Sequence, residues 1–128
     1  MAEYGPLETY PGVTAAADLS GKVYHLVRFS AARTVNQASE AVNSGLAGVL
    51  QNKPDASGQP ATVAYLGVSK VVAGGTITAN DWLTTDSSGR AITAASGDMI
   101  CGRALVAGAA AATITAFLQP PTRLSGAV

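Results

Sequence analysis

Short runs of β-branched, aromatic and aliphatic residues recur along this chain, and clusters of glycine, serine, asparagine, aspartate and proline separate them. Apolar and polar positions alternate within many of these runs, as is typical of half-buried β-strands. The runs return roughly every 8 to 12 residues, and no stretch has the repeat of a long amphipathic helix. The pattern predicts an all-β domain, built as a small barrel or sandwich. The expected strands are residues 22–29, 46–50, 61–66, 68–72, 76–85, 90–93, 99–106 and 112–118.

The clearest unit is a predicted hairpin within residues 71–94. Gly74-Gly75 ends the apolar run before it, and Asp86-Ser87-Ser88-Gly89 supplies the small polar residues and the glycine that a tight reversal needs. The alternation of this hairpin and of the other strands predicts the core. Its candidates are Val27, Phe29, Val63, Ile77, Trp82, Ile92, Leu105 and Ile114.

The two ends of the chain differ from the region between them. Residues 1–18 contain two prolines and no regular period, so we expect an extended N-terminal arm. Tyr4 and Tyr10 lie in this arm, although a solvated tail is usually poor in aromatic residues. The arm therefore either docks on another molecule or folds back on its own domain. Residues 19–118 form the predicted β-rich domain, and residues 119–128 read as a tail that leaves it.

Two short segments are less regular. Residues 34–44 are expected to form a turn or a short helix, because they are too few to hold an isolated helix. Gly67 separates two apolar runs and marks a bulge or bend.

Composition limits the function classes. The 128 residues fit one domain, and eight basic and eight acidic residues give no net charge, so no nucleic-acid footprint is visible. Charged residues make up 12% of the chain and hydrophobic residues 48%, which indicates either surface hidden in an assembly or an excess of alanine. No apolar run approaches the 18 or so residues that span a bilayer, and the N-terminus lacks a secretion signal. We expect no membrane partner and synthesis in the cytoplasm.

Residues with catalytic potential are few and scattered. His25 is the chain's one histidine and lies in a predicted strand without a flanking acid, so we expect a hydrogen-bonded structural residue. Cys101 lies in an apolar run and is expected to be a buried thiol. Asp81, Asp86 and Asp98 stand in turns, where capping of the backbone is the ordinary role of aspartate. No metal site, cofactor site or phosphate-binding loop is predicted, and we expect no enzyme.

A series of motifs does resemble a known family. The order runs from GVLQN (48–52) and Pro54 through ATV (61–63) to AG--I---D-L at 73–83, and then to GRA (89–91) and GRAL (102–105). Over about residues 13–118 the chain resembles the capsid decoration, or cement, proteins of tailed bacteriophages. Its ASEAVNS stretch at 38–44 departs from the short turn usual there.

The resemblance implies a β-clip or β-tulip type of fold and a structural role without an active site. It implies a protein that sits on the outer capsid surface of the virion, made in the host cytoplasm, and that stabilises the icosahedral head by bridging subunits. The implied partners are the phage major capsid protein and further copies of the chain, most commonly as a homotrimer. In this family an N-terminal arm often touches the capsid, which assigns Tyr4, Leu7 and Tyr10 to that contact.

Two other functions remain open at this level. One is a β-clip module that binds a glycan or similar small molecule, with Trp82 and Tyr65 as stacking platforms. The other is an enzyme that uses the carboxylates of the aspartate-bearing turns.

Overall fold

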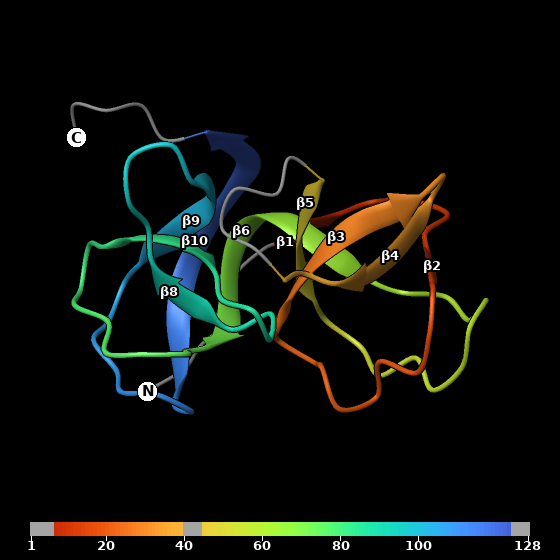
Figure 1. Cartoon of the computed structure of the whole chain (residues 1–128), viewed down its shortest axis with the longest axis horizontal. Coiled ribbons are helices and arrows are strands. Elements are labelled where there is room, and N and C mark those ends of the chain that lie inside the picture. Colours follow the sequence, from red (N-terminus) through yellow and green to blue (C-terminus); the bar gives the residue numbers. More distant parts are fainter. Residues whose placement is uncertain (1–6, 40–44, 124–128) are drawn as a thin grey trace.

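The computed structural model describes residues 7–39 and 45–123, and these residues form one mixed sheet of ten strands (Figure 1). The strands are β1 (Leu7–Thr9), β2 (Thr14–Ala15), β3 (Leu26–Ala31), β4 (Thr34–Gln37), β5 (Leu46–Leu50), β6 (Val63–Val72), β7 (Trp82–Thr85), β8 (Ala91–Thr93), β9 (Met99–Ala104) and β10 (Thr113–Arg123). The all-β prediction is confirmed. Within the described ranges no helix is long and apolar enough to cross a membrane.

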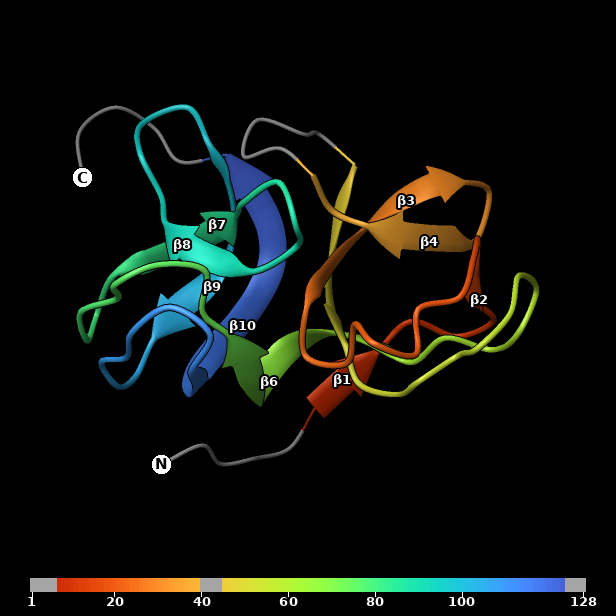
Figure 2. The ribbon, with the colours of Figure 1, turned by 60° about the horizontal axis from the view of Figure 1, so that its bottom comes forward.

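Strand β6 connects the two halves of the molecule. In Figures 1 and 2, β7 to β10 lie on one side of it, whereas β2 to β5 lie on the other. Ala64 pairs with both Val49 of β5 and Thr9 of β1, and Gly67 pairs with both Leu118 of β10 and Leu7 of β1. Because a strand residue has one neighbour on each edge, β5 and β10 share one edge of β6 and β1 lies on the other. We call the two halves the N-terminal lobe (β1 to β5) and the C-terminal lobe (β7 to β10).

The sheet is not closed into a barrel, so that part of the prediction is wrong. Its order is β2-β4-β3-β5-β6-β10-β9-β7-β8, with β1 beside β6. The two terminal strands of this path belong to different lobes. Because β5 and β10 occupy successive parts of the same edge of β6, the sheet curls separately in each lobe and its ends do not meet.

The described residues bury two hydrophobic clusters, one per lobe. The N-terminal cluster includes Val27, Val35, Leu50 and Val63, and the C-terminal cluster includes Leu26, Val49, Val71, Ile77, Leu83, Ile114 and Leu118. Strand β5 contributes Ala47 and Leu50 to the first cluster, and Leu46 and Val49 to the second. All five of its residues are buried, which explains why its sequence, LAGVL, contains no polar side chain.

The predicted core residues divide into three groups. Val27, Val63, Ile77 and Ile114 are buried, whereas Phe29, Trp82 and Ile92 are partly buried. Leu105, in contrast, is 46% exposed and does not belong to the core. The reason is the alternation of the chain at the end of β9, where Ala104 points into the C-terminal cluster and the next residue points outward.

Several of the predicted elements differ in the structure. The strand expected at 22–29 begins at Leu26, and of the strand expected at 76–85 only Trp82–Thr85 forms. Residues 34–37 form strand β4, and neither a turn nor a helix, because they pair with both β3 and β2. Residues 40–44 of that segment lie outside the described ranges. The runs on either side of Gly67 form the single strand β6, in which Gly67 has a φ of 115°.

Strand β10 also continues to Arg123, past the predicted start of the C-terminal tail. Thr122 and Arg123 pair with β9 after a register shift that follows Leu118. Pairing with β6 ends at Leu118, so Pro120 and Pro121 lie where β10 has lost that neighbour. Proline is tolerated there because a strand edge requires no N–H donor.

Candidate functional site

An outward-facing row of side chains crosses four strands of the C-terminal half. The register pairs Val68 of β6 with Phe117 of β10, Phe117 with Arg103 of β9, and Arg103 with Trp82 of β7. Direct cross-strand partners lie on the same face of a sheet. The neighbouring residues Ala116, Leu118 and Ala104 are buried in the core, so the row faces away from it.

This face continues past β6 onto β1. Leu7 and Gly67 are partners on the core side, because Gly67 is also the partner of buried Leu118. The next pair, Glu8 and Leu66, therefore lies on the outer side. We call Glu8, Leu66, Val68, Trp82, Arg103, Leu105 and Phe117 the outer face.

Large apolar side chains are exposed on the outer face. Phe117 is 44% exposed and Leu105 46%, and Leu66 is exposed at 36%. Exposed apolar residues are common when single, but a contiguous group rimmed by charge marks an interaction surface. Aromatic side chains and arginine are also the residue types that interface cores favour. The outer face has the composition of a protein-binding surface.

Arg103 is held in position at one end of this surface. Its guanidinium carbon lies 4.6 Å from the centre of the Trp82 ring, and its Nε donates a hydrogen bond of 3.1 Å to the carbonyl oxygen of Asn80. The ion pair seen in the described ranges joins Arg90 to Asp86, so Arg103 has no carboxylate partner there. A fixed arginine of this kind can receive a carboxylate from another molecule.

The described residues of the N-terminal segment contact their own domain. Leu7 packs against the C-terminal cluster. The Tyr10 ring lies 4.5 Å from that of Tyr65 and 5.2 Å from that of Phe29, and its hydroxyl donates to the Ala47 carbonyl at 3.1 Å. Burial, followed by the neighbouring Tyr65, raises the pKa of Tyr10. Tyr4 lies outside the described residues, and contact of these three residues with a capsid stays a prediction.

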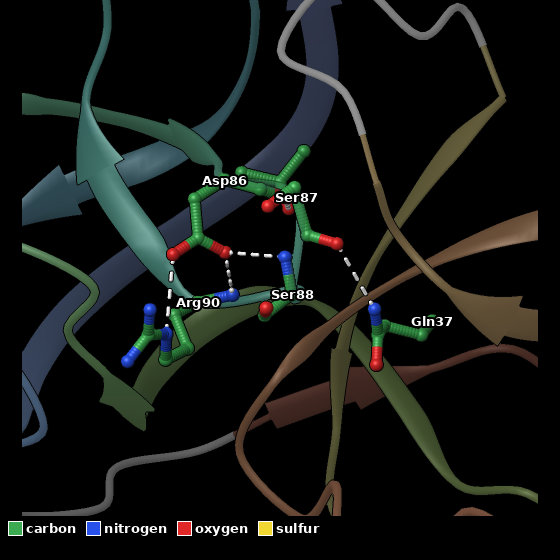
Figure 3. A network of polar contacts seen from close by, with 6 residues as sticks. Gln37, Asp86, Ser87, Ser88 and Arg90 are labelled. Atoms are coloured by element: carbon green, nitrogen blue, oxygen red, sulfur yellow. Dashed lines mark hydrogen bonds and ion pairs between the residues drawn. The ribbon is translucent and has the colours of Figure 1, made fainter.

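The β7–β8 turn connects the two lobes through polar contacts (Figure 3). Asp86 Oδ1 accepts hydrogen bonds from the backbone nitrogens of Ser88 and Arg90, both at 2.8 Å, and its Oδ2 lies 3.1 Å from Arg90 Nε. Gln37 of β4 donates from Nε2 to the Ser87 carbonyl at 3.1 Å. The turn therefore has a structural function in fixing the lobes together.

The other aspartates also cap turns. Asp81 Oδ2 accepts from the Thr78 nitrogen at 2.9 Å, and Asp98 Oδ2 accepts from the Ala95 nitrogen at 2.8 Å. These carboxylates satisfy local backbone donors, as the capping interpretation predicted.

The remaining reactive groups are placed as structural residues. His25 Nδ1 lies 3.1 Å from the Val23 carbonyl oxygen, and burial raises the pKa of the Cys101 thiol to about 12. The described part of the chain contains no group of three or more histidine, cysteine, aspartate or glutamate residues that could hold a metal ion. One face of each proposed stacking ring is also occupied, since Tyr65 packs on Tyr10 and Arg103 covers Trp82.

Sequence reasoning did not single out Phe117 or Arg103. A signal was present in residues 113–118, where Ile114, Ala116 and Leu118 alternate with Thr113, Thr115 and Phe117. If the first set faces the core, Phe117 must face outward. The neighbouring strands, and hence the rest of the outer face, depend on pairing between distant segments.

Comparisons with known proteins give one family match and one structural likeness. The family model described as phage cement protein matches residues 20–119. The chain is similar in structure to the head fibre gp8.5 N base of bacteriophage phi29, with a TM-score of 0.68 and 19% sequence identity, over 88% of this chain and 94% of that one. At this identity the likeness shows a shared fold. No curated protein matches the chain.

Proposed function

Because this chain belongs to the phage cement protein family, a structural and non-enzymatic family located on the virion capsid, we propose that it stabilises an icosahedral head by bridging neighbouring major capsid subunits on the outer surface. The observation that carries this proposal is the family match over residues 20–119, which spans strands from both lobes. The exposed apolar outer face supports it, because an assembly can cover such a surface.

The mechanism is preferential binding to the assembled shell. A molecule that binds the intact head and not its separated subunits stabilises the head by mass action. An oligomer that touches several subunits gains further, because each later contact forms at a high effective concentration. We therefore include a homotrimer in the proposal, with the major capsid protein as the second partner.

We assign capsid contact to the N-terminal arm through Tyr4, Leu7 and Tyr10. Pairing of β1 with β6 and the packing of Tyr10 support a fixed root from which the preceding residues can act. Membership of the β-clip or β-tulip group of folds is a further part of this proposal.

Co-sedimentation with undecorated heads of the same phage tests the function. The full-length protein should pellet with the heads and raise the temperature at which they rupture. A variant that lacks residues 1–6 keeps β1 and Tyr10, and it should bind more weakly if the arm contributes. Heads already saturated with unlabelled protein are the control, and they should take up no labelled protein. If the full-length protein stays in the supernatant while the heads pellet, and the rupture temperature of the heads is unchanged, the cement function is rejected.

A further inference from the structure

The outer face carries opposite charges on its two sides. Glu8 stands on β1, at one edge of β6, and Arg103 stands on β9, beyond β10 at the other edge. The apolar residues Leu66, Val68 and Phe117 lie between them along the register. A surface that has an acid on one side, a base on the other and an apolar centre can place its acid against the base of a second copy.

Both charges are available to another molecule. Glu8 is exposed, and within the described ranges it has no ion pair or side-chain hydrogen bond. Arg103 contacts the ring of Trp82 and a carbonyl oxygen, and no carboxylate of those ranges lies within ion-pair distance.

Most of the other described carboxylates already accept hydrogen bonds within their own turns. Asp18 accepts from Ser20, whereas Asp81, Asp86 and Asp98 accept from the backbone of their turns. Asp55 is exposed but lies in the loop between β5 and β6, which contributes no residue to the outer face. Glu8 is therefore the described carboxylate that combines exposure with a place beside exposed apolar side chains.

We propose that the outer face of one copy is covered by the outer face of a second copy, with Arg103 of one against Glu8 of the other. This deepens the self-association in the proposed function by naming the surface that performs it. A two-fold contact would form the charge pair twice, and a cyclic ring would form it once at each junction. Phe117 and Leu66 supply the apolar centre, and the charges fix which way the two faces meet.

Charge reversal in the full chain tests the pairing by sedimentation velocity over a range of protein concentrations. Arg103→Glu and Glu8→Arg each place like charges opposite one another, so each should raise the dissociation constant of self-association at least about tenfold. The double variant Arg103→Glu with Glu8→Arg restores opposite charges and should recover most of the loss. Phe117→Ser should weaken association without any change of charge.

Two matched controls keep the test specific. Lys53→Glu and Asp55→Arg make the same charge changes at exposed positions of the loop between β5 and β6, and they should leave association unchanged. Circular dichroism and thermal unfolding of each variant separate loss of association from loss of fold, which matters because Arg103 also packs on Trp82.

Three results would overturn the proposal. They are a wild-type protein that stays monomeric, single reversals without effect, and a double variant no better than the single ones. If the wild type is monomeric and Phe117→Ser abolishes head binding, the outer face binds the capsid instead. Co-sedimentation with heads is scored separately, so a protein that associates but does not bind heads would reject the cement function and leave this interface intact.

Discussion

Gly89 occupies a position in the β7–β8 turn where any side chain would be strained. It has a φ of 78°, its carbonyl accepts a hydrogen bond of 2.6 Å from the Leu26 nitrogen, and a Cβ placed on it would lie 2.9 Å from the Leu26 carbonyl oxygen. Gly89→Ala should therefore lower the free energy of unfolding by about 2 to 4 kcal/mol, from a left-handed backbone cost plus overpacking. Urea denaturation measures this loss.

Gly58 provides the matched control for that substitution. It also has a positive φ, of 88°, but a Cβ there would meet nothing within 4 Å. Gly58→Ala should cost only the backbone term of about 1 kcal/mol. Equal losses of unfolding free energy at the two glycines would show that the close approach of Gly89 to β3 does not affect stability.

Cys101 should be chemically inert while the protein is folded. The thiol is buried, and burial raises its pKa to about 12, so very little thiolate is present at pH 8. A thiol reagent should react within minutes in denaturant and hardly at all without it. Comparable rates in the two conditions would mean that the C-terminal cluster opens readily.

The raised pKa of this thiol makes the stability of the protein depend on pH. Its pKa in the unfolded chain is about 8.5, so the folded state retains the proton to higher pH than the unfolded state does. Its contribution to stability is complete below pH 8.5 or so and is lost progressively as the pH rises toward 12. Cys101→Ala should flatten this decline in urea denaturation between pH 8 and 10, and an unchanged slope would contradict it.

At the scale of elements, the β7–β8 turn depends more on its cap than on its ion pair. Asp86 accepts two backbone hydrogen bonds, while its partner Arg90 is 37% exposed. Asp86→Ala should lower the free energy of unfolding by about 2 kcal/mol, because the backbone N–H groups of Ser88 and Arg90 lose a charged acceptor. Asp86→Asn keeps an oxygen acceptor and should cost about 1 kcal/mol or less, since exposed ion pairs contribute little.

Thermal and urea unfolding of both variants measure this difference. Asp98→Ala is the comparison at a turn outside the lobe contact, where the carboxylate accepts from the Ala95 nitrogen. Equal losses for Asp86→Ala and Asp86→Asn would assign the stability of the turn to the ion pair instead.

At the scale of the whole molecule, the lobes should unfold together. Strand β5 supplies residues to both hydrophobic clusters, and β6 pairs with strands of both lobes. Gln37 and Leu26 also bond to the β7–β8 turn across the lobe boundary. Domains that share core strands in this way are expected to unfold in one cooperative transition.

Trp82, the one tryptophan of the chain, reports on the C-terminal lobe. Val27→Ala removes buried methyl groups from the N-terminal cluster and should cost about 2 kcal/mol. In this variant the urea midpoint measured by Trp82 fluorescence should fall, and it should equal the urea midpoint measured by circular dichroism of the whole sheet. A fluorescence midpoint that does not move would show that the lobes unfold independently.

Strand positions were largely predictable because alternation is a local property. Residues 46–50, 82–85 and 91–93 form strands close to where the pattern placed them, with the turn at 86–90 between the last two. The segment at 34–37 was not recognised, because its pairing with β2 and β3 comes from residues distant in the sequence. The end of β10 was missed for a similar reason, since the prolines are accommodated only by the local absence of β6.

The residues of the outer face could be predicted only in part. Periodicity indicates which side of β10 faces the core, and so places Phe117 outside. It does not indicate that Arg103 and Trp82 are its neighbours, because their strands lie side by side only after β9 and β7 have paired. Leu105 shows the same limit, since its apolar character suggested the core and the phase of β9 directs it outward.

The sequence by itself determined the all-β class, the main turns, the capping aspartates and, through its motifs, the resemblance to phage cement proteins, which the family match over 20–119 supports. These features depend on residue type and short-range spacing. The tertiary structure alone decided that the sheet stays open, that β5 and β6 serve two cores, and that Glu8 and Arg103 flank one apolar face. The physical reason is that strand order and register are set by hydrogen bonds between segments far apart in the chain, and local alternation does not specify which segments meet.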